Sequence, residues 1–210
     1  MYVRGNKGMN NNLFECLSLS PADLKQADIA IATARAGGTG LLDCEHCKDL
    51  PLAESILASL VSAVRDDQQI GLRVRATQLA GAGKLLDILA GRPHCLLLSA
   101  DDRASIEAGI ASLPGCDSRR LLIEVTSVEL AKDLSGMNID GIVARGHESA
   151  GWSGEDSSFI LTQKIAAMQE HPVFVHGGVG IHTAAAGKAA GAAGGVLGDQ
   201  LLLMPEAPLP

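Results

Sequence analysis

Three apolar runs late in the chain decide the fold: IDGIVARGHESAGWSGED (139–156), HPVFVHGGVGIH (171–182) and AGGVLGDQLLL (193–203). Each run contains a polar turn rich in glycine. A strand that is apolar throughout is normally covered on both faces, as in a parallel sheet flanked by helices. Glycines after such a strand let backbone amides approach a ligand closely. The three runs therefore predict the last strands of an α/β domain, with a ligand site at their carboxyl ends.

The same pattern extends toward the N-terminus as an alternation of apolar strands and amphipathic helices. Right-handed βαβ crossovers close readily into a barrel, whereas a doubly wound sheet usually has fewer strands. We therefore predict a compact (β/α)₈ TIM barrel. The eight expected strands are LFECLSLS (13–20), TGLLDCE (39–45), QIGLRVR (69–75), HCLLLSA (94–100), RLLIEVTS (120–127), DGIVARG (140–146), PVFVHGG (172–178) and GGVLGDQLLL (194–203).

A helix is expected after each strand except the last. The first is expected to begin at Ser20-Pro21-Ala22-Asp23, which supplies a capping residue, a proline in the first turn and an early acid. It should run to Arg35 and end at Gly37-Gly38, as a C-terminal cap would. Later helices are expected near residues 52–65, 84–91, 104–113, 128–134, 159–170 and 182–190.

The chain of 210 residues is long enough for one buried core, although about 250 residues is typical of this barrel. We predict a flexible segment over residues 1–12, a barrel domain over 13–204 and a proline-rich tail or linker over 205–210. Prolines in MPEAPLP (204–210) prevent that segment from forming an eighth helix. We expect a domain cut from a longer polypeptide, or a last strand that a partner covers.

Composition excludes several classes of partner. The formal net charge of −7 argues against nucleic acid. The sequence has no run of about 18 apolar residues and no apolar signal core at its start, so no membrane span is predicted and the cytoplasm is expected. An odd count of 5 cysteines indicates reduced thiols. Cys44 and Cys47 form a lone CxxC pair without a second pair at zinc spacing, which favours a structural or incidental role, and no metal is predicted.

In this fold the active site lies at the carboxyl ends of the strands, and phosphate commonly sits between the loops after strands seven and eight. Gly177 and Gly178 occupy the first of these loops, where free amides and a helix N-terminus favour an anion. The alternative is a tight turn. Arg73 and Arg75 share one strand face. They are expected to hold an anionic group, or to be solvated at the rim or matched to Glu124 on a nearby strand.

Two histidines are candidate acids or bases. His176 ends strand seven and should lie at the mouth, whereas His147 is placed on the opposite strand face from Glu148. Either histidine can instead be a hydrogen-bonded structural residue. The acidic loop 153–158 is expected to cap the following helix. Trp152 is expected either to stack on a flat ring or to pack beneath its loop.

GIVARGHESAGWSG (141–154), PVFVHGGVG (172–180) and GAAGGVLGDQLLL (191–203) resemble the FMN-dependent nitronate monooxygenase family, also called 2-nitropropane dioxygenase-like. The resemblance is specific over about the last third of the chain, and it favours the versions embedded in multidomain polyketide or polyunsaturated fatty acid synthases. It implies an FMN-dependent oxidoreductase, either an enoyl-thioester reductase or nitronate monooxygenase-like. The implied partners are other synthase domains or a homodimer partner, and the substrate is a small molecule or an acyl thioester. The implied flavin-binding residues are Gly146, Glu148, Gly151, Gly177, Gly178 and Gly198.

The chain departs from the family pattern at two positions. Trp152, which has no basic nitrogen, stands where the family has its catalytic histidine. Gly198-Asp199 replaces a Gly-Thr turn, and a carboxylate repels a neighbouring phosphate unless a cation or hydrogen bonds intervene. The catalytic candidates are His176, Trp152 and Glu124, and the candidates for substrate binding are Arg73, Arg75 and Arg145.

Three functions remain open from the sequence. The first is the FMN-dependent oxidoreductase that the resemblance implies. The second is a non-catalytic, flavin-free barrel that serves as a scaffold or docking domain. The third is a cofactor-free lyase or isomerase that uses His176, Glu124 and the arginines.

Overall fold

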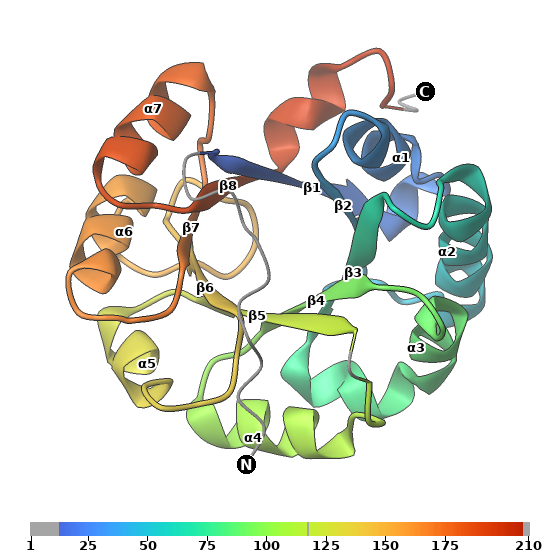
Figure 1. Ribbon diagram of the computed structural model, residues 1–210, viewed down its shortest axis with the longest axis horizontal. Coiled ribbons are helices and arrows are strands. Elements are labelled where there is room, and N and C mark those ends of the chain that lie inside the picture. Colours follow the sequence, from blue (N-terminus) through green and yellow to red (C-terminus); the bar gives the residue numbers. More distant parts are fainter. Residues whose placement is uncertain (1–12, 117, 208–210) are drawn as a thin grey trace.

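The computed structural model describes residues 13–116 and 118–207. Eight parallel strands in sequence order form a closed barrel, in which β1 pairs with both β2 and β8 (Figure 1). This confirms the predicted (β/α)₈ barrel. The strands are β1 (Glu15–Pro21), β2 (Thr39–Asp43), β3 (Gln69–Arg75), β4 (His94–Ser99), β5 (Arg119–Val125), β6 (Gly141–Arg145), β7 (Val173–His176) and β8 (Gly194–Leu197). The predicted flexible segment 1–12 and positions 208–210 of the predicted tail lie outside the described residues.

Helices surround the barrel as an outer ring (Figure 1). They bury an apolar layer against the outer faces of the strands, as the alternation of apolar runs predicts. The α-helices are α1 (Asp28–Arg35), α2 (Leu50–Ala63), α3 (Gly83–Leu89), α4 (Arg103–Ser112), α5 (Val128–Asp133), α6 (Ser158–Ala166) and α7 (Ile181–Ala189). Three 3₁₀ helices complete the elements: η1 (Ala22–Leu24), η2 (Ala76–Gly81) and η3 (Asp199–Leu203).

The first helix begins later than predicted. Pro21 is extended, with φ −60° and ψ 129°, and it ends β1 opposite Asp43 of β2. A proline is tolerated at such a strand end, where a ladder hydrogen bond is not required of it. Ser20, the expected cap, is instead a buried strand residue whose hydroxyl donates to the Gln26 carbonyl at 3.4 Å. Helix α1 therefore starts only at Asp28.

The eighth strand is shorter than predicted. Gly198 has φ −119° and ψ −113°, which breaks the extended conformation, and the next five residues form η3. As expected, no α-helix follows β8 within the described part of the chain. Instead, η3 lies between α7 and α1 (Figure 1), and Leu201 and Met204 border a groove along α1.

A separate apolar cluster fills the inside of the barrel. Because strand side chains alternate between faces, the residues two positions further along each strand also point inward. The inner cluster therefore sets the direction of the polar side chains at the carboxyl ends of the strands. Its members are Leu17, Leu19, Leu41, Cys95, Leu97, Leu122, Val143, Phe174 and Val196.

Close packing of α1 on β2 depends on Gly40. A Cβ at this position would lie 2.0 Å from the Ala30 carbonyl oxygen. We expect Gly40→Ala to lower the free energy of unfolding by about 1–3 kcal/mol, because helix and strand backbones must separate. Urea denaturation measures the change. The control is Gly83→Ala at the start of α3, where a Cβ meets nothing within 4 Å and no destabilisation is expected. Equal stability of both variants would contradict this account of the packing.

Candidate functional site

Four charged or titratable side chains meet inside the barrel at the carboxyl ends of its strands. Each follows an inward-facing position by two residues, as Glu124 follows Leu122, so all four point into the mouth. All four are buried. They are Arg73 on β3, Glu124 on β5, Arg145 on β6 and His176 on β7.

Glu124 is the centre of this group. Its Oε1 accepts hydrogen bonds from Arg73 Nη2 at 2.6 Å and from Arg145 Nη1 at 2.9 Å. Its Oε2 lies 3.0 Å from His176 Nδ1. Of the alternatives for the two arginines, a match to Glu124 therefore holds for Arg73. Both carboxylate oxygens are engaged by charge-assisted or imidazole donors.

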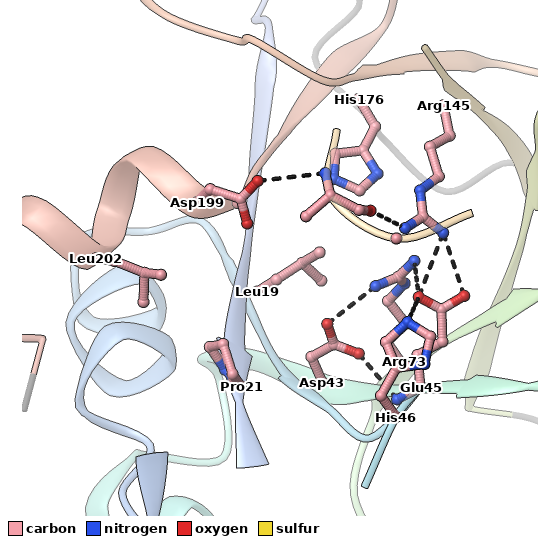
Figure 2. Close-up of a pocket in the computed structure, with 13 residues that line it drawn as sticks. Leu19, Pro21, Asp43, Glu45, His46, Arg73, Arg145, His176, Asp199 and Leu202 are labelled. Carbon is pink, nitrogen blue, oxygen red and sulfur yellow. Dashed lines mark hydrogen bonds and ion pairs between the residues drawn. The ribbon is translucent and has the colours of Figure 1, made fainter. Parts of the chain in front are cut away.

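Two further carboxylates complete the network, and the sequence analysis missed both. Glu45, in the loop after β2, lies 2.7 Å from Arg73 Nη2 and 3.2 Å from Arg145 Nη1. Asp43, the last residue of β2, accepts from Arg73 Nη1 at 2.9 Å. Figure 2 shows both guanidinium groups directed toward Glu45. Asp43 could have been found, because it follows the inward-facing Leu41 by two residues, as Glu124 follows Leu122. We refer to Asp43, Glu45, Arg73, Glu124, Arg145 and His176 as the mouth network.

The mouth network keeps its central carboxyl ionised. Burial alone would raise the pKa of Glu124, but the charges of Arg73, His176 and Arg145 outweigh it and hold that pKa well below its usual range. Burial likewise acts to lower the pKa of Arg73, and the carboxylates of Glu124, Asp43 and Glu45 more than reverse that effect. The mouth is therefore ionic at neutral pH.

The ionised Glu124 determines the tautomer of His176. A carboxylate only accepts hydrogen bonds, so Nδ1 must carry a proton in this pair, and in the neutral imidazole the lone pair is therefore on Nε2. Nε2 has no hydrogen-bond partner among residues 13–116 and 118–207. It lies 3.5 Å from the position that a Cβ on Gly198 would occupy. His176 is thus an oriented base at the mouth, the position predicted for it.

A small polar pocket of about 90 Å³ opens beside His176. Its lining includes Asp43, Glu45, Arg73, Arg145, His176 and Asp199, together with apolar side chains such as Leu19 and Leu202 (Figure 2). With Glu124 beneath them, the carboxylates outnumber the guanidinium groups by four to two. The site therefore has a formal charge of −2 when its histidines are neutral, which disfavours an anionic ligand.

The loop after β7 forms a tight turn, the alternative to the predicted phosphate loop. Gly177 and Gly178 have φ values of 112° and 61°, which favour glycine. The turn passes beneath the β6 loop, since a Cβ on Gly177 would lie 3.2 Å from the Ser149 nitrogen. The phosphate-binding role of the two glycines stays a prediction.

Side chains of the chain itself occupy the gap between the β7 and β8 loops. Gln200 Nε2 donates to the Val179 carbonyl at 2.6 Å, and Gln200 Oε1 accepts from the Gly198 nitrogen at 3.3 Å. Asp199 accepts from the Ala150 nitrogen at 3.3 Å. The amide of Gly198, which a phosphate would use, is therefore already paired, and a carboxylate lies beside it.

The residues of the mouth do not fit FMN in this arrangement. The pocket is several times smaller than the roughly 300–1,000 Å³ of sites for ligands of this size. Asp199 repels a phosphate at the strand-eight turn, and Gln200 takes up its amide. Arg145 also holds the β6 loop over the mouth, because its Nη2 donates to the Ala150 carbonyl.

Several predicted site residues lie away from this pocket. Trp152 is 69% exposed on the β6 loop, and Arg75 pairs with Asp101 at the rim. Glu148 accepts from the Ser158 nitrogen at 2.8 Å, which fastens the start of α6. Ser157 caps the same helix, as predicted for this loop. Of the predicted flavin-binding residues, only Gly151 and Gly198 line the pocket. The positions of Trp152 and Arg75 therefore do not support the roles predicted for them.

The described residues contain no group of three or more histidine, cysteine, aspartate or glutamate side chains suited to a metal ion. Nor does any helix within residues 13–116 and 118–207 have the length and apolar character needed to cross a membrane.

Fold and site together define the class of protein: a (β/α)₈ barrel whose mouth carries a buried ionic network and an oriented histidine. Among solved structures it is similar to FabK from Thermotoga maritima, with 21% identity, a TM-score of 0.75 and coverage of 92% of this chain and 60% of that one. It also resembles nitroalkane oxidase from Streptomyces ansochromogenes, with 20% identity, a TM-score of 0.70 and coverage of 92% and 68%.

A third similar structure is thiamine phosphate pyrophosphorylase from Pyrococcus furiosus, with 16% identity, a TM-score of 0.66 and coverage of 94% of this chain and 91% of that one. No protein-family model matches the chain, and no curated protein matches it significantly. At these identities the likeness establishes the barrel fold. The chain spans about three fifths of the FabK chain that it matches.

Proposed function

We propose that this barrel is an enzyme domain that catalyses proton transfer on a small carbonyl compound without using flavin. One observation carries the proposal: His176 is held by an ionised, buried Glu124 at Nδ1, and its Nε2 is available at the pocket. This is the geometry of an oriented general base, because the carboxylate fixes the tautomer and stabilises the imidazolium that forms.

In the proposed reaction, His176 Nε2 removes a proton from a carbon next to a carbonyl group. Negative charge then develops on the carbonyl oxygen. The guanidinium groups of Arg73 and Arg145 on the pocket wall can stabilise this charge locally, although the carboxylates paired with them weaken the effect. Returning the proton to a different carbon gives an isomerase, and loss of a leaving group gives a lyase.

The pocket restricts the substrate to a small, uncharged group. Four carboxylates against two guanidinium groups disfavour a phosphate, and about 90 Å³ accommodates only a short chain. The acyl end of a short thioester meets both conditions. Such a substrate agrees with the resemblance to synthase domains, and neighbouring synthase domains or a second copy of this chain remain the proposed partners.

A second candidate is an FMN-dependent oxidoreductase, either an enoyl-thioester reductase or nitronate monooxygenase-like. The likeness to FabK and to nitroalkane oxidase favours it. For FMN to bind, the β6 loop would have to leave Arg145, and Asp199 and Gln200 would have to vacate the strand-eight turn. If the protein catalyses neither proton transfer nor FMN-dependent oxidoreduction, the remaining hypothesis applies, in which the barrel is a non-catalytic scaffold.

Two measurements on the purified chain distinguish these functions. We expect a colourless protein that does not quench the fluorescence of added FMN. We also expect it to accelerate hydrogen–deuterium exchange at the α-carbon of acetoacetyl-N-acetylcysteamine, followed by proton NMR in D₂O. Stoichiometric FMN binding would replace this proposal with the second candidate. If exchange proceeds only at the background rate and FMN does not bind, the remaining hypothesis is the non-catalytic scaffold.

A further inference from the structure

A separate thiol pair lies just outside the mouth, in the turn Cys44-Glu45-His46-Cys47 between β2 and α2. The Cys47 nitrogen donates to the Cys44 carbonyl at 3.2 Å. An i to i+3 turn of this kind brings its end Cα atoms within about 7 Å, and disulfides usually need about 4.4–6.8 Å. The backbone therefore already holds the two cysteines at a separation suited to a disulfide.

The two side chains also face each other. The two thiols are close enough for Cys47 to act, together with burial, to raise the pKa of the Cys44 thiol. The Cys47 thiol itself donates to the Asp49 carbonyl at 3.3 Å, and both cysteines are free. Both line a surface pocket of about 360 Å³ that also involves Lys48, Val74 and Gln78. This pocket is distinct from the mouth pocket beside His176. A small oxidant can therefore reach the pair from outside the barrel.

The remaining cysteines do not form such a pair. Cys16 is on β1, Cys95 is on β4, and Cys116 follows α4. Burial raises the pKa of the Cys95 thiol to about 12, so that thiol is unreactive at neutral pH. Cys16 is exposed, and the Ser118 side chain lowers the pKa of Cys116, so these two thiols can form mixed disulfides with the oxidant. An intramolecular disulfide should therefore form only at the turn.

The turn is joined directly to the mouth network through Glu45, which lies between the two cysteines. Only 1% of the Glu45 side chain is exposed, and it contacts both Arg73 and Arg145. Its backbone nitrogen donates to Asp43 Oδ1 at 3.0 Å. A disulfide would draw the two sulfur atoms to about 2.0 Å and fix the turn that positions this carboxylate.

We propose that Cys44 and Cys47 are a redox-active dithiol that a low-molecular-weight disulfide converts to an intramolecular disulfide, with a change of the mouth network through Glu45. Cys47, the more exposed partner, attacks one sulfur of the oxidant as a thiolate and releases one thiol. Cys44 then loses its proton and attacks the Cys47 sulfur, which releases the second thiol. Two electrons pass to the oxidant, and its two sulfurs leave as thiols.

The second step should be the slower one at neutral pH. Burial, reinforced by the neighbouring Cys47 and Asp43, holds the pKa of Cys44 well above its usual range. Ring closure should therefore accelerate as the pH rises, because the attacking species is the Cys44 thiolate.

The experiment equilibrates the full chain with mixtures of reduced and oxidised glutathione, blocks free thiols with N-ethylmaleimide after acid denaturation, and digests with trypsin. Both cysteines fall in one tryptic peptide, residues 36–48. The expected product is this peptide without maleimide and about 2 Da lighter than its reduced form. Dithiothreitol should restore the reduced peptide.

Two variants sharpen the test. Cys47→Ser should abolish the light peptide, and Cys16→Ser should leave it unchanged. The ring-proton NMR signals of His176 should shift on oxidation of the wild type and stay in place for Cys47→Ser. A peptide 36–48 that carries two maleimides at every glutathione ratio, or only a glutathione adduct on Cys47, overturns the proposal. An intramolecular disulfide with unmoved His176 signals overturns the link to the mouth.

Discussion

Glu124→Gln is expected to lower the free energy of unfolding by about 3–5 kcal/mol, the cost of breaking a buried ion pair from one side. The substitution keeps the side-chain volume, so no cavity contributes. It removes the charge that Arg73 Nη2 and Arg145 Nη1 contact at 2.6 and 2.9 Å. Both guanidinium groups would then remain buried, with Glu45 and Asp43 as their remaining charged partners.

Urea denaturation of both proteins at neutral pH measures this loss. The matched control is Glu107→Gln on α4, where the pair with Arg103 has the same 2.6 Å separation but side chains that are 46% and 53% exposed. Because solvent screens this exposed ion pair, Glu107→Gln should lower the free energy of unfolding by well under about 1 kcal/mol. If Glu124→Gln is no more destabilising than Glu107→Gln, the mouth network does not stabilise the barrel.

The same pair of proteins should differ in acid. The pKa of Glu124 is lower in the folded chain than in the unfolded chain, where a glutamate titrates near about 4.3. The unfolded state therefore binds more protons over this range, and stability rises with pH. The stabilisation that ionised Glu124 provides is fully present above about pH 4.3, and it is lost as the pH falls toward the pKa of Glu124 in the folded chain. Glu124→Gln should show a correspondingly weaker pH dependence below that point.

The sequence contains most of the information for the barrel because eight apolar runs alternate with helical patterns. It was less reliable at the strand ends. Ser20-Pro21-Ala22-Asp23 has the composition of a helix start. In the structure, however, Pro21 is the last residue of β1, where it lies opposite Asp43 of β2. This pairing joins residues far apart in the sequence, so local composition does not predict it. Likewise, the apolar residues after Gly198 suggest that the strand continues, but the backbone conformation of Gly198 ends it and η3 follows.

The site could be predicted where strand periodicity applies. Side-chain alternation puts Arg73 and Arg75 on one strand face, with a match to Glu124 as one alternative, and the structure shows that match for Arg73 but not for Arg75. His176, predicted at the mouth because it ends strand seven, does line the mouth pocket. Glu45 was missed although the predicted strand 39–45 ended on it. In the structure β2 ends at Asp43, and Glu45 reaches the two arginines from the loop that follows. Trp152 was chosen from a motif resemblance, but the β6 loop turns its ring toward solvent. The geometry of loops depends on long-range contacts that the sequence does not display.

Replacing His176 by glutamine is expected to slow the proposed proton transfer by about 10²–10⁴-fold, the usual contribution of a positioned general base. An amide at this position cannot take up a proton at neutral pH. Because the side chain still reaches Glu124 as a hydrogen-bond donor, the mouth network should persist and the stability should change less than in Glu124→Gln.

The assay is deuterium exchange at the α-carbon of acetoacetyl-N-acetylcysteamine, with urea denaturation run in parallel. His147→Gln is the control, since His147 is exposed on the β6 loop and contacts only backbone there, with Nδ1 3.3 Å from the Glu155 carbonyl oxygen. It should retain the wild-type rate. Glu124→Gln should lower the rate as well, because loss of the ionised acceptor removes both the fixed tautomer of His176 and the counter-charge of its imidazolium. If exchange survives in His176→Gln, His176 is not the base, and its contact with Glu124 is structural.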